Sequence, residues 1–189
     1  MITKKDYDAM LIERHGQQVF DTLAKAHVGI AGLGGLGSNI AMMLARSGVG
    51  HLLLIDFDRV EPSNLNRQHY MVSHLGIPKS EALKDLILQA NPFIHLNTRC
   101  MRITGENAPK LFKDCDLVCE AFDKPEAKAE LVNSLLEHCP GLPILSGSGM
   151  AGYGSSNTIR TEKVMKNLYL CGDRVSDIES VGTLMAPRV

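Results

Sequence analysis

The chain has 189 residues, 44% of them hydrophobic, and its 20 Lys and Arg residues nearly balance 21 Asp and Glu residues, for a formal net charge of −1. A chain of this length can form one domain that buries roughly 70% of the surface exposed by its unfolded state. The near-neutral charge argues against nucleic acid or an anionic membrane as a partner. No apolar run is as long as a signal peptide or as the ~20 residues that span a bilayer. We therefore expect a cytoplasmic protein.

In chain order, the sequence predicts one or two helices within residues 5–25 and then short apolar runs that alternate with segments of helical period. The expected strands cover residues 27–32, 51–56, 94–99, 116–121 and 142–146. Such alternation is typical of a parallel sheet with crossover helices. We predict an α/β fold with a Rossmann-like, doubly wound and mostly parallel sheet, N-terminal helices and a C-terminal extension of the sheet.

We expect one nucleotide-binding domain over residues 1–189, with N-terminal helices (1–26), a core (27–146) and a C-terminal segment (147–189). The Gly/Ser-rich stretch SGSGMAGYGSSN, residues 146–157, follows a predicted strand end. It is either a flexible lid over a ligand or a turn into further strands. The last residues contain no evident closing element, which leads us to expect a truncated chain.

The motif GLGGLG, residues 32–37, stands between an apolar run and a helix-like run. Gly32 permits a tight turn out of the strand, Gly34 lets the backbone approach a phosphate, and Gly37 lets helix and sheet pack closely. Asp56 ends the second predicted strand, where its carboxylate can accept hydrogen bonds from both ribose hydroxyls of a nucleotide. The motif alone leaves NAD and ATP open, because both present an adenosine and phosphates to such a turn.

The segment DFDRVEPSNLNRQ, residues 56–68, is dense in polar side chains. It contains Asp58, Asn64, Arg67 and Gln68 in addition to Asp56. Hydride transfer has no need of such a cluster, whereas nucleotidyl chemistry needs fixed donors that match charge spread over several oxygens. A solvated loop with charges there by chance is the alternative interpretation.

Four motifs in this order, GLGGLGS, DFD, SNLNRQ and IPKSEA, resemble the superfamily of ubiquitin-activating-type adenylyltransferases, most closely its small bacterial ThiF/MoeB-like members. The resemblance extends from about residue 10 to the end, where LMAPRV also looks like a segment of the family. It implies an enzyme that uses ATP to adenylate the C-terminal glycine carboxylate of a ubiquitin-like sulfur carrier protein ending in Gly-Gly. Pyrophosphate would be released, and thiamine biosynthesis is the expected pathway.

The resemblance also implies roles for particular residues. Asn64, Arg67 and Lys79 would contact the triphosphate, and Lys79 opens a predicted helix, where a bound anion would offset its unfavourable charge. Asp123, after a third strand end, would bind Mg²⁺ and ATP, with Asp58 as an additional ligand. The remaining expected ATP-binding residues are Gly32, Gly34, Gly35, Gly37, Asp56 and Gln68. The segment DKPEAK, residues 123–128, departs from the family because the usual threonine and arginine are absent.

Arg14 would reach the ATP phosphates of a partner subunit, as an arginine does in family members, so that the active unit is a homodimer. An exposed arginine without a catalytic role is the alternative.

Five cysteines form no CxxC pair, so the sequence does not predict the zinc site of larger relatives. Cys100, Cys115 and Cys119 lie in or beside predicted strands and are expected to be small buried residues. Adenylation is therefore supported more strongly than covalent sulfur transfer, for which Cys171 is the remaining candidate. Two alternatives stay open for the whole chain, an NAD(P)-dependent oxidoreductase and a catalytically silent nucleotide-binding adaptor.

Overall fold

The five expected strands form, and two more complete a seven-stranded sheet, in the computed structural model, which describes residues 2–176. The strands are β1 (His27–Ala31), β2 (His51–Ile55), β3 (His95–Arg99), β4 (Leu117–Glu120), β5 (Ile144–Gly147), β6 (Arg160–Lys163) and β7 (Leu168–Gly172). Their order across the sheet is β3-β2-β1-β4-β5-β7-β6, and only β6 and β7 pair antiparallel. The predicted mostly parallel α/β fold is confirmed.

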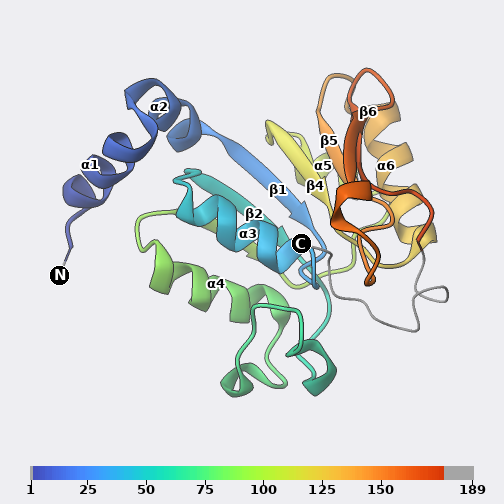
Figure 1. Cartoon of the computed structure of the whole chain (residues 1–189), viewed down its shortest axis with the longest axis horizontal. Helices are drawn as coiled ribbons and strands as arrows, with labels where there is room; N and C mark the ends of the chain where they lie inside the picture. Colours follow the sequence, from blue (N-terminus) through green and yellow to red (C-terminus); the bar gives the residue numbers. More distant parts are fainter. Residues whose placement is uncertain (1, 177–189) are drawn as a thin grey trace.

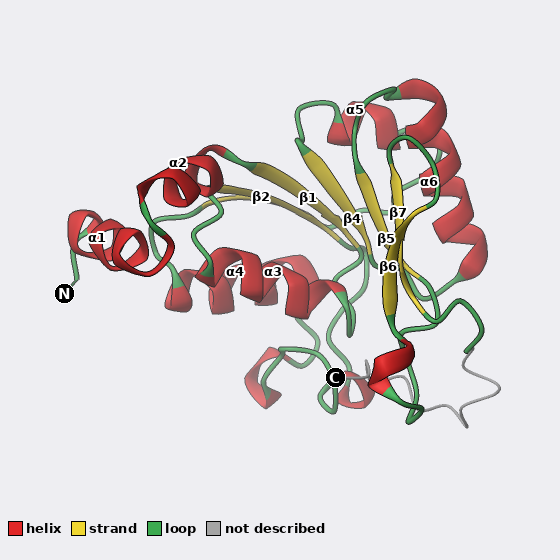
Figure 2. Ribbon diagram, turned by 45° about the horizontal axis from the view of Figure 1, so that its top comes forward, coloured by secondary structure: helices red, strands yellow, loops and turns green. Residues whose placement is uncertain are grey.

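Helices cover both faces of the sheet (Figure 2). The helices are α3 (Gly37–Arg46) and α4 (Lys79–Ala90) on one face and α5 (Ala108–Phe112) and α6 (Pro125–His138) on the other. Alternate strand residues separate the two cores, since Ile30 of β1 packs toward α3 and α4, whereas the next residue, Ala31, packs toward α5 and α6. Within the described residues, no helix combines the length and the apolarity needed to cross a bilayer.

Two helices precede the sheet, α1 (Lys4–His15) and α2 (Gln17–Lys25), and Figure 1 shows them beyond one end of β1. A capping box at Thr3 begins α1, and Gly16, with φ of +79°, lets the chain turn between the helices. Leu11 is buried, and its side chain lies 2.8 Å from where a Cβ on Gly48 would stand. The α1 helix therefore packs at the end of the sheet where the parallel strands begin.

The C-terminal part of the described chain extends the sheet. Residues 146–157 lead through a short 3₁₀ turn, η3 (Ser156–Thr158), into the hairpin of β6 and β7. Of the two alternatives for this segment, the turn into further strands is thus confirmed. The motif LMAPRV, residues 184–189, and the expected truncation after it lie outside the described residues.

The five cysteines are free, and they differ in burial. Cys119, on the central strand β4, is buried as expected, and Cys115 is half-buried. Burial raises the pKa of each thiol to about 11, with Asp114 and Asp116 adding to the effect at Cys115. The expectation of a buried Cys100 was wrong, because this residue is exposed and follows β3, one of the two edge strands of the sheet.

Replacing Gly37 by Ala should destabilise the protein by about 3 kcal/mol or more, a large overpacking effect. A Cβ on Gly37 would lie 1.9 Å from the carbonyl oxygen of Gly32, so the backbone would have to move. Gly34→Ala is the matched control, because its nearest protein atom would be 3.8 Å away. Chemical denaturation measures both variants, and equal stability of the two would contradict this account of the turn.

Candidate active site

The candidate site begins at the glycine turn after β1, residues 32–37. Gly32 has φ of +88°, and a Cβ there would lie 2.9 Å from the ring of Phe122 and 3.0 Å from the carbonyl oxygen of Ala121. The turn out of β1 therefore packs directly against the turn out of β4. Only a glycine allows both this backbone conformation and this approach.

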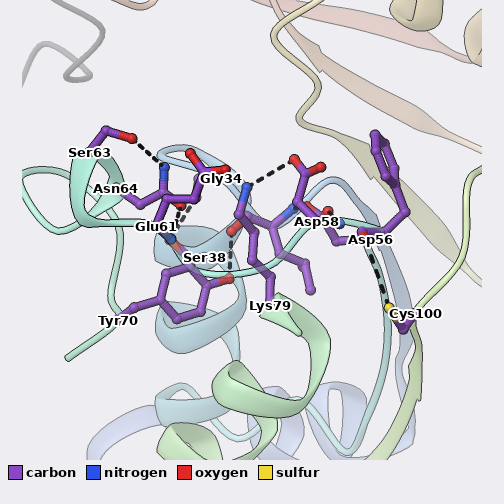
Figure 3. A network of polar contacts seen from close by, with 12 residues as sticks. Gly34, Ser38, Asp56, Asp58, Glu61, Ser63, Asn64, Tyr70, Lys79 and Cys100 are labelled. Carbon is purple, nitrogen blue, oxygen red and sulfur yellow. Dashed lines mark hydrogen bonds and ion pairs between the residues drawn. The ribbon is translucent and has the colours of Figure 1, made fainter. Parts of the chain in front are cut away.

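A second segment, residues 56–79, runs from the end of β2 to the start of α4. It contains two short 3₁₀ turns, η1 (Pro62–Asn64) and η2 (Val72–His74). The ends of the segment are joined, because the Lys79 amide donates to the Asp58 carbonyl oxygen at 2.9 Å. The segment thus folds back to the glycine turn. Figure 3 shows labelled residues of this segment, such as Asn64 and Lys79, gathered around Gly34.

The Asp56 carboxylate connects the two segments. Its Oδ2 accepts the Leu33 amide at 2.6 Å, and its Oδ1 accepts the Asp58 amide at 2.8 Å. The residue is 8% exposed, and desolvation raises the pKa of its carboxyl group, although both amides and Lys79 act in the opposite direction. A carboxylate oxygen can accept two hydrogen bonds, so each oxygen of Asp56 keeps one acceptor site after its bond to an amide. The expected contact of Asp56 with a ribose stays a prediction.

Lys79 is buried and forms an ion pair. Its side chain is 8% exposed, and Nζ lies 3.1 Å from Oδ2 of Asp58, whose side chain is half exposed. An ammonium group carries three N–H donors. The pair therefore holds Lys79 in place and leaves it donors for an anion, whereas Asp58, expected as a metal ligand, is engaged with this cation.

Arg67 and Gln68 lie against the middle of the glycine turn. The Arg67 side chain comes within 3.4 Å of where a Cβ on Gly35 would stand, and Gln68 Nε2 is 3.8 Å from the corresponding point on Gly34. Gln68 is 9% exposed, and its Oε1 is buried without a hydrogen-bond partner in the described structure. A buried orphan acceptor beside an open glycine surface is the kind of group that a bound ligand satisfies.

Asn64, expected at the triphosphate, has a local structural contact. It is 8% exposed, and its Oδ1 accepts the Glu61 amide at 3.0 Å, which closes η1. Its Nδ2 lies 3.5 Å from the Ser63 hydroxyl oxygen. The structure thus brings Asn64 into the same segment as Arg67 and Lys79, and its contact with phosphate remains a prediction.

Three supporting residues escaped the sequence analysis. The Ser38 hydroxyl donates to the Gly34 carbonyl at 2.6 Å, and the Asn39 amide donates to the carbonyls of Gly35 and Arg67. Tyr70, which is buried, donates from Oη to the Leu33 carbonyl at 2.7 Å. The pair Ser-Asn directly after a glycine turn was an available signal, because such side chains readily bond the carbonyl four residues earlier.

Asp123, the expected metal ligand, is exposed three residues after Glu120, which pairs in register with Ala31 at the end of β1. Glu120 is fully buried and holds the turn leading to Asp123. Its carboxylate accepts the Phe122 amide at 2.7 Å, Lys128 Nζ at 2.5 Å and the Ser146 hydroxyl at 2.5 Å. A charged residue at the end of an apolar strand was the signal for this network.

No group of three or more His, Cys, Asp or Glu side chains that could hold a metal occurs within residues 2–176. This result concerns sites built by the protein alone. Magnesium bound through a nucleotide needs only one or two carboxylates, since phosphate oxygens and water complete its shell.

Arg14 is exposed on α1, at the end of the sheet where the parallel strands begin. The glycine turn and Lys79 lie at the opposite end of the sheet, where β1 and β2 end, because Asp56 bonds the Leu33 amide and Asp58 bonds the Lys79 amide. Within one chain, the structure therefore does not bring Arg14 to the other expected site residues. Its role in a partner subunit stays a prediction.

Replacing Asp56 by Ala should destabilise the protein by about 1–3 kcal/mol, because the amides of Leu33 and Asp58 would lose their acceptor. The matched control is Asp114→Ala, which removes an exposed carboxylate. Urea denaturation compares the free energies of unfolding. Equal values for wild type and Asp56→Ala would show that the carboxylate does not hold the two segments together.

A model of the ThiF family matches residues 7–182. The chain is 32% identical over 145 residues to the adenylyltransferase and sulfurtransferase UBA4 of Yarrowia lipolytica. The matched region covers 77% of this chain and 36% of the relative. It is 36% identical over 138 residues to the tRNA threonylcarbamoyladenosine dehydratase of Bacillus subtilis, covering 72% of this chain and 54% of the relative. The chain thus spans about a third to a half of the length of these curated relatives.

Among solved structures, the Escherichia coli tRNA N6-threonylcarbamoyladenosine dehydratase TcdA in complex with ATP is similar, with a TM-score of 0.78 and 26% identity. The likeness covers 88% of this chain and 69% of that chain. Escherichia coli MccB with AMPCPP and MccA matches at 30% identity and a TM-score of 0.61, over 71% of this chain and 40% of that chain. The resemblance carried by the four motifs is confirmed, and the chain belongs to the ThiF family.

Proposed function

We propose that this chain uses ATP and Mg²⁺ to adenylate the C-terminal glycine carboxylate of a ubiquitin-like sulfur carrier protein, with release of pyrophosphate. The observation that carries the proposal is the joining of two segments by Asp56. One segment is a glycine turn with an open surface, and the other carries Arg67 and the buried Lys79. Such a pairing of backbone cradle and cations suits a triphosphate.

The chemistry explains the choice of residues. A carboxylate that attacks the α-phosphorus brings two anions together, so the site must supply positive charge and alignment, whereas the nucleophile needs no general base. Lys79 offers a fixed point charge, and Arg67 offers a planar fork of donors suited to phosphate oxygens. Hydride transfer to a nicotinamide develops no charge on phosphate oxygens and therefore has less need of these two cations.

The residues of the turn fit a nucleotide. Gly34 has no close protein neighbour, so its glycine is not required by packing within this chain. The Gln68 side chain approaches this position with its Nε2, and its Oε1 is buried without a partner in the described structure. A ribose hydroxyl or an amino group would satisfy this acceptor. TcdA, which this chain resembles in fold, has been solved in complex with ATP and with AMP, and this supports a nucleotide as the ligand here.

Asp123 would hold Mg²⁺ together with phosphate oxygens of ATP, and the ion would neutralise charge on the leaving pyrophosphate. The fixed turn after β4 supports this assignment, because Glu120 anchors the backbone just before Asp123. The exposed position of Asp123 also suits a carboxylate that shares its metal with a ligand rather than with other side chains.

The likeness to UBA4 favours the sulfur carrier, and so does a likeness to the adenylyltransferase and sulfurtransferase MOCS3 of Dictyostelium discoideum. This chain is 37% identical to MOCS3 over 153 residues, and the match covers 76% of this chain and 36% of that relative. Thiamine biosynthesis is our specific choice of pathway. A second candidate substrate is tRNA carrying threonylcarbamoyladenosine, favoured by the likeness to the two dehydratases. The formal net charge of −1 weighs against tRNA, because it provides no general attraction for a polyanion.

Exchange of labelled pyrophosphate into ATP tests the proposal. With Mg²⁺ and a carrier ending in Gly-Gly, the wild type should catalyse exchange, and Lys79→Ala or Arg67→Ala should lower the rate roughly 10²–10³-fold, the scale for losing a donor aimed at transition-state charge. Lys84→Ala, on the same helix and with a side chain that is 42% exposed, is the control that should keep the rate.

The same assay separates the alternatives. Exchange that depends on modified tRNA and not on the carrier would move the proposal to the second substrate. Nucleotide binding without exchange would indicate a silent adaptor, and tight NADH binding without ATP binding would indicate an oxidoreductase.

We further propose a homodimer in which Arg14 completes the site of the partner subunit, since α1 lies remote from the glycine turn of its own chain. A mixture of Arg14→Ala and Lys79→Ala proteins should then recover about a quarter of the wild-type exchange rate, because random pairing leaves one intact site in half of the dimers. Each variant alone serves as the control. Absence of any recovery after subunit exchange would contradict a shared site.

A further inference from the structure

The Leu33 carbonyl, inside the glycine turn, is held by a buried tyrosine from the segment 56–79. Tyr70 is 4% exposed, and its Oη donates to the Leu33 carbonyl oxygen at 2.7 Å. Burial raises the pKa of the Tyr70 hydroxyl, and the carboxylates of Asp56 and Asp58 add to this effect. The hydroxyl therefore keeps its proton and stays a hydrogen-bond donor.

This bond fixes a whole peptide unit. A peptide bond is planar and trans, so the Leu33 carbonyl and the Gly34 N–H belong to one rigid unit and point in opposite directions. The carbonyl points at the buried Tyr70 hydroxyl, and the Gly34 N–H therefore points away from it. Leu33 is buried, whereas Gly34 is half-buried and has no close protein neighbour. Within residues 2–176, the Gly34 N–H has no hydrogen-bond acceptor.

The peptide units on either side are fixed as well. In the preceding unit, the Leu33 N–H donates to Oδ2 of Asp56 at 2.6 Å. In the following unit, the Gly34 carbonyl accepts the Ser38 amide at 3.0 Å and the Ser38 hydroxyl at 2.6 Å. The Gly35 N–H of that unit points away from α3 for the same reason, and it too has no acceptor in the described part of the chain. Two neighbouring N–H donors of this kind suit an anion.

We propose that Tyr70 is a positioning residue that turns the Gly34 N–H toward a phosphate group of the bound nucleotide. Tyr70 acts through the turn, because its hydroxyl is buried and bonded to the Leu33 carbonyl. The identity of the nucleotide rests on the proposed function. The orientation of the peptide unit rests on the hydrogen bond alone.

Tyr70→Phe is the variant that tests this role, since it removes the hydroxyl and keeps the buried ring. The Leu33 carbonyl loses its donor, and the peptide unit is then free to rotate. Tyr7→Phe is the matched control, because the Tyr7 hydroxyl also donates to a backbone carbonyl, that of Ala90, at 3.4 Å. Tyr7 lies on α1, at the opposite end of the sheet from the glycine turn.

Calorimetric titration with inorganic tripolyphosphate and with ATP, each with Mg²⁺, measures the effect on binding. Tyr70→Phe should raise the Kd of both compounds roughly 10- to 100-fold, the scale of one lost hydrogen bond to a charged group. Tyr7→Phe should keep the wild-type values. Adenosine carries no phosphate, so its Kd should be the same for Tyr70→Phe and wild type. Unchanged binding of the phosphate compounds, or an equal loss for adenosine, would overturn the proposal.

Residual dipolar couplings of the ligand-free proteins report the orientation of each N–H and do not depend on a nucleotide. The Gly34 N–H coupling should differ between wild type and Tyr70→Phe, whereas the couplings of β1 should agree. An unchanged Gly34 orientation would overturn the proposal. In the wild type alone, tripolyphosphate should shift the Gly34 amide proton downfield, and the absence of this shift at saturation would overturn the proposal even if Tyr70→Phe does not fold.

NADH, which also contains phosphate groups, separates this proposal from the proposed function. If the wild type binds NADH and not ATP, and Tyr70→Phe weakens the binding of NADH, the positioning role stands and the proposed function fails. A wild type that binds neither tripolyphosphate nor either nucleotide would overturn both.

Discussion

The carboxylate of Asp56 is the constraint on which the candidate site depends. It is nearly buried, it accepts one amide from the glycine turn and one from the segment after β2, and it stands near Lys79. Burial of a charge is costly unless hydrogen bonds and an opposite charge compensate. Here the compensating bonds come from two loops that follow neighbouring strands, so the buried carboxylate fixes one loop against the other. Tyr70 adds a second link, to the Leu33 carbonyl.

The glycines of the turn divide into two kinds. Gly32 and Gly37 are required by packing inside the chain, because a side chain at either position would meet backbone or a ring. Gly34 and Gly35 meet only the flexible side chains of Gln68 and Arg67. The first kind shapes the turn, and the second kind leaves the surface of the turn open. The motif alone does not make this distinction.

Much of the fold was predictable from periodicity, because each buried strand is a short apolar run and Pro78 marks the start of α4. For the candidate site, the sequence predicted which segments contribute residues, because their motifs occur in the order typical of the family. Contacts that depend on tertiary neighbours were not. The burial of Cys100 was predicted wrongly because β3 proved to be an edge strand, and Glu120 was missed because its partners come from α6 and β5. Arg14 could not be placed from sequence, since the edge of the sheet on which α1 packs is decided by contacts such as that of Leu11 with Gly48.

Amide NMR of the protein during titration with ATP and Mg²⁺ tests the central claim most directly. If the two segments joined by Asp56 form one nucleotide site, the amides of Leu33 and Gly34 should shift at the same ATP concentrations as those of Asp58 and Lys79, and NADH should have no such effect. Shifts confined to the glycine turn, or a stronger response to NADH than to ATP, would contradict the account.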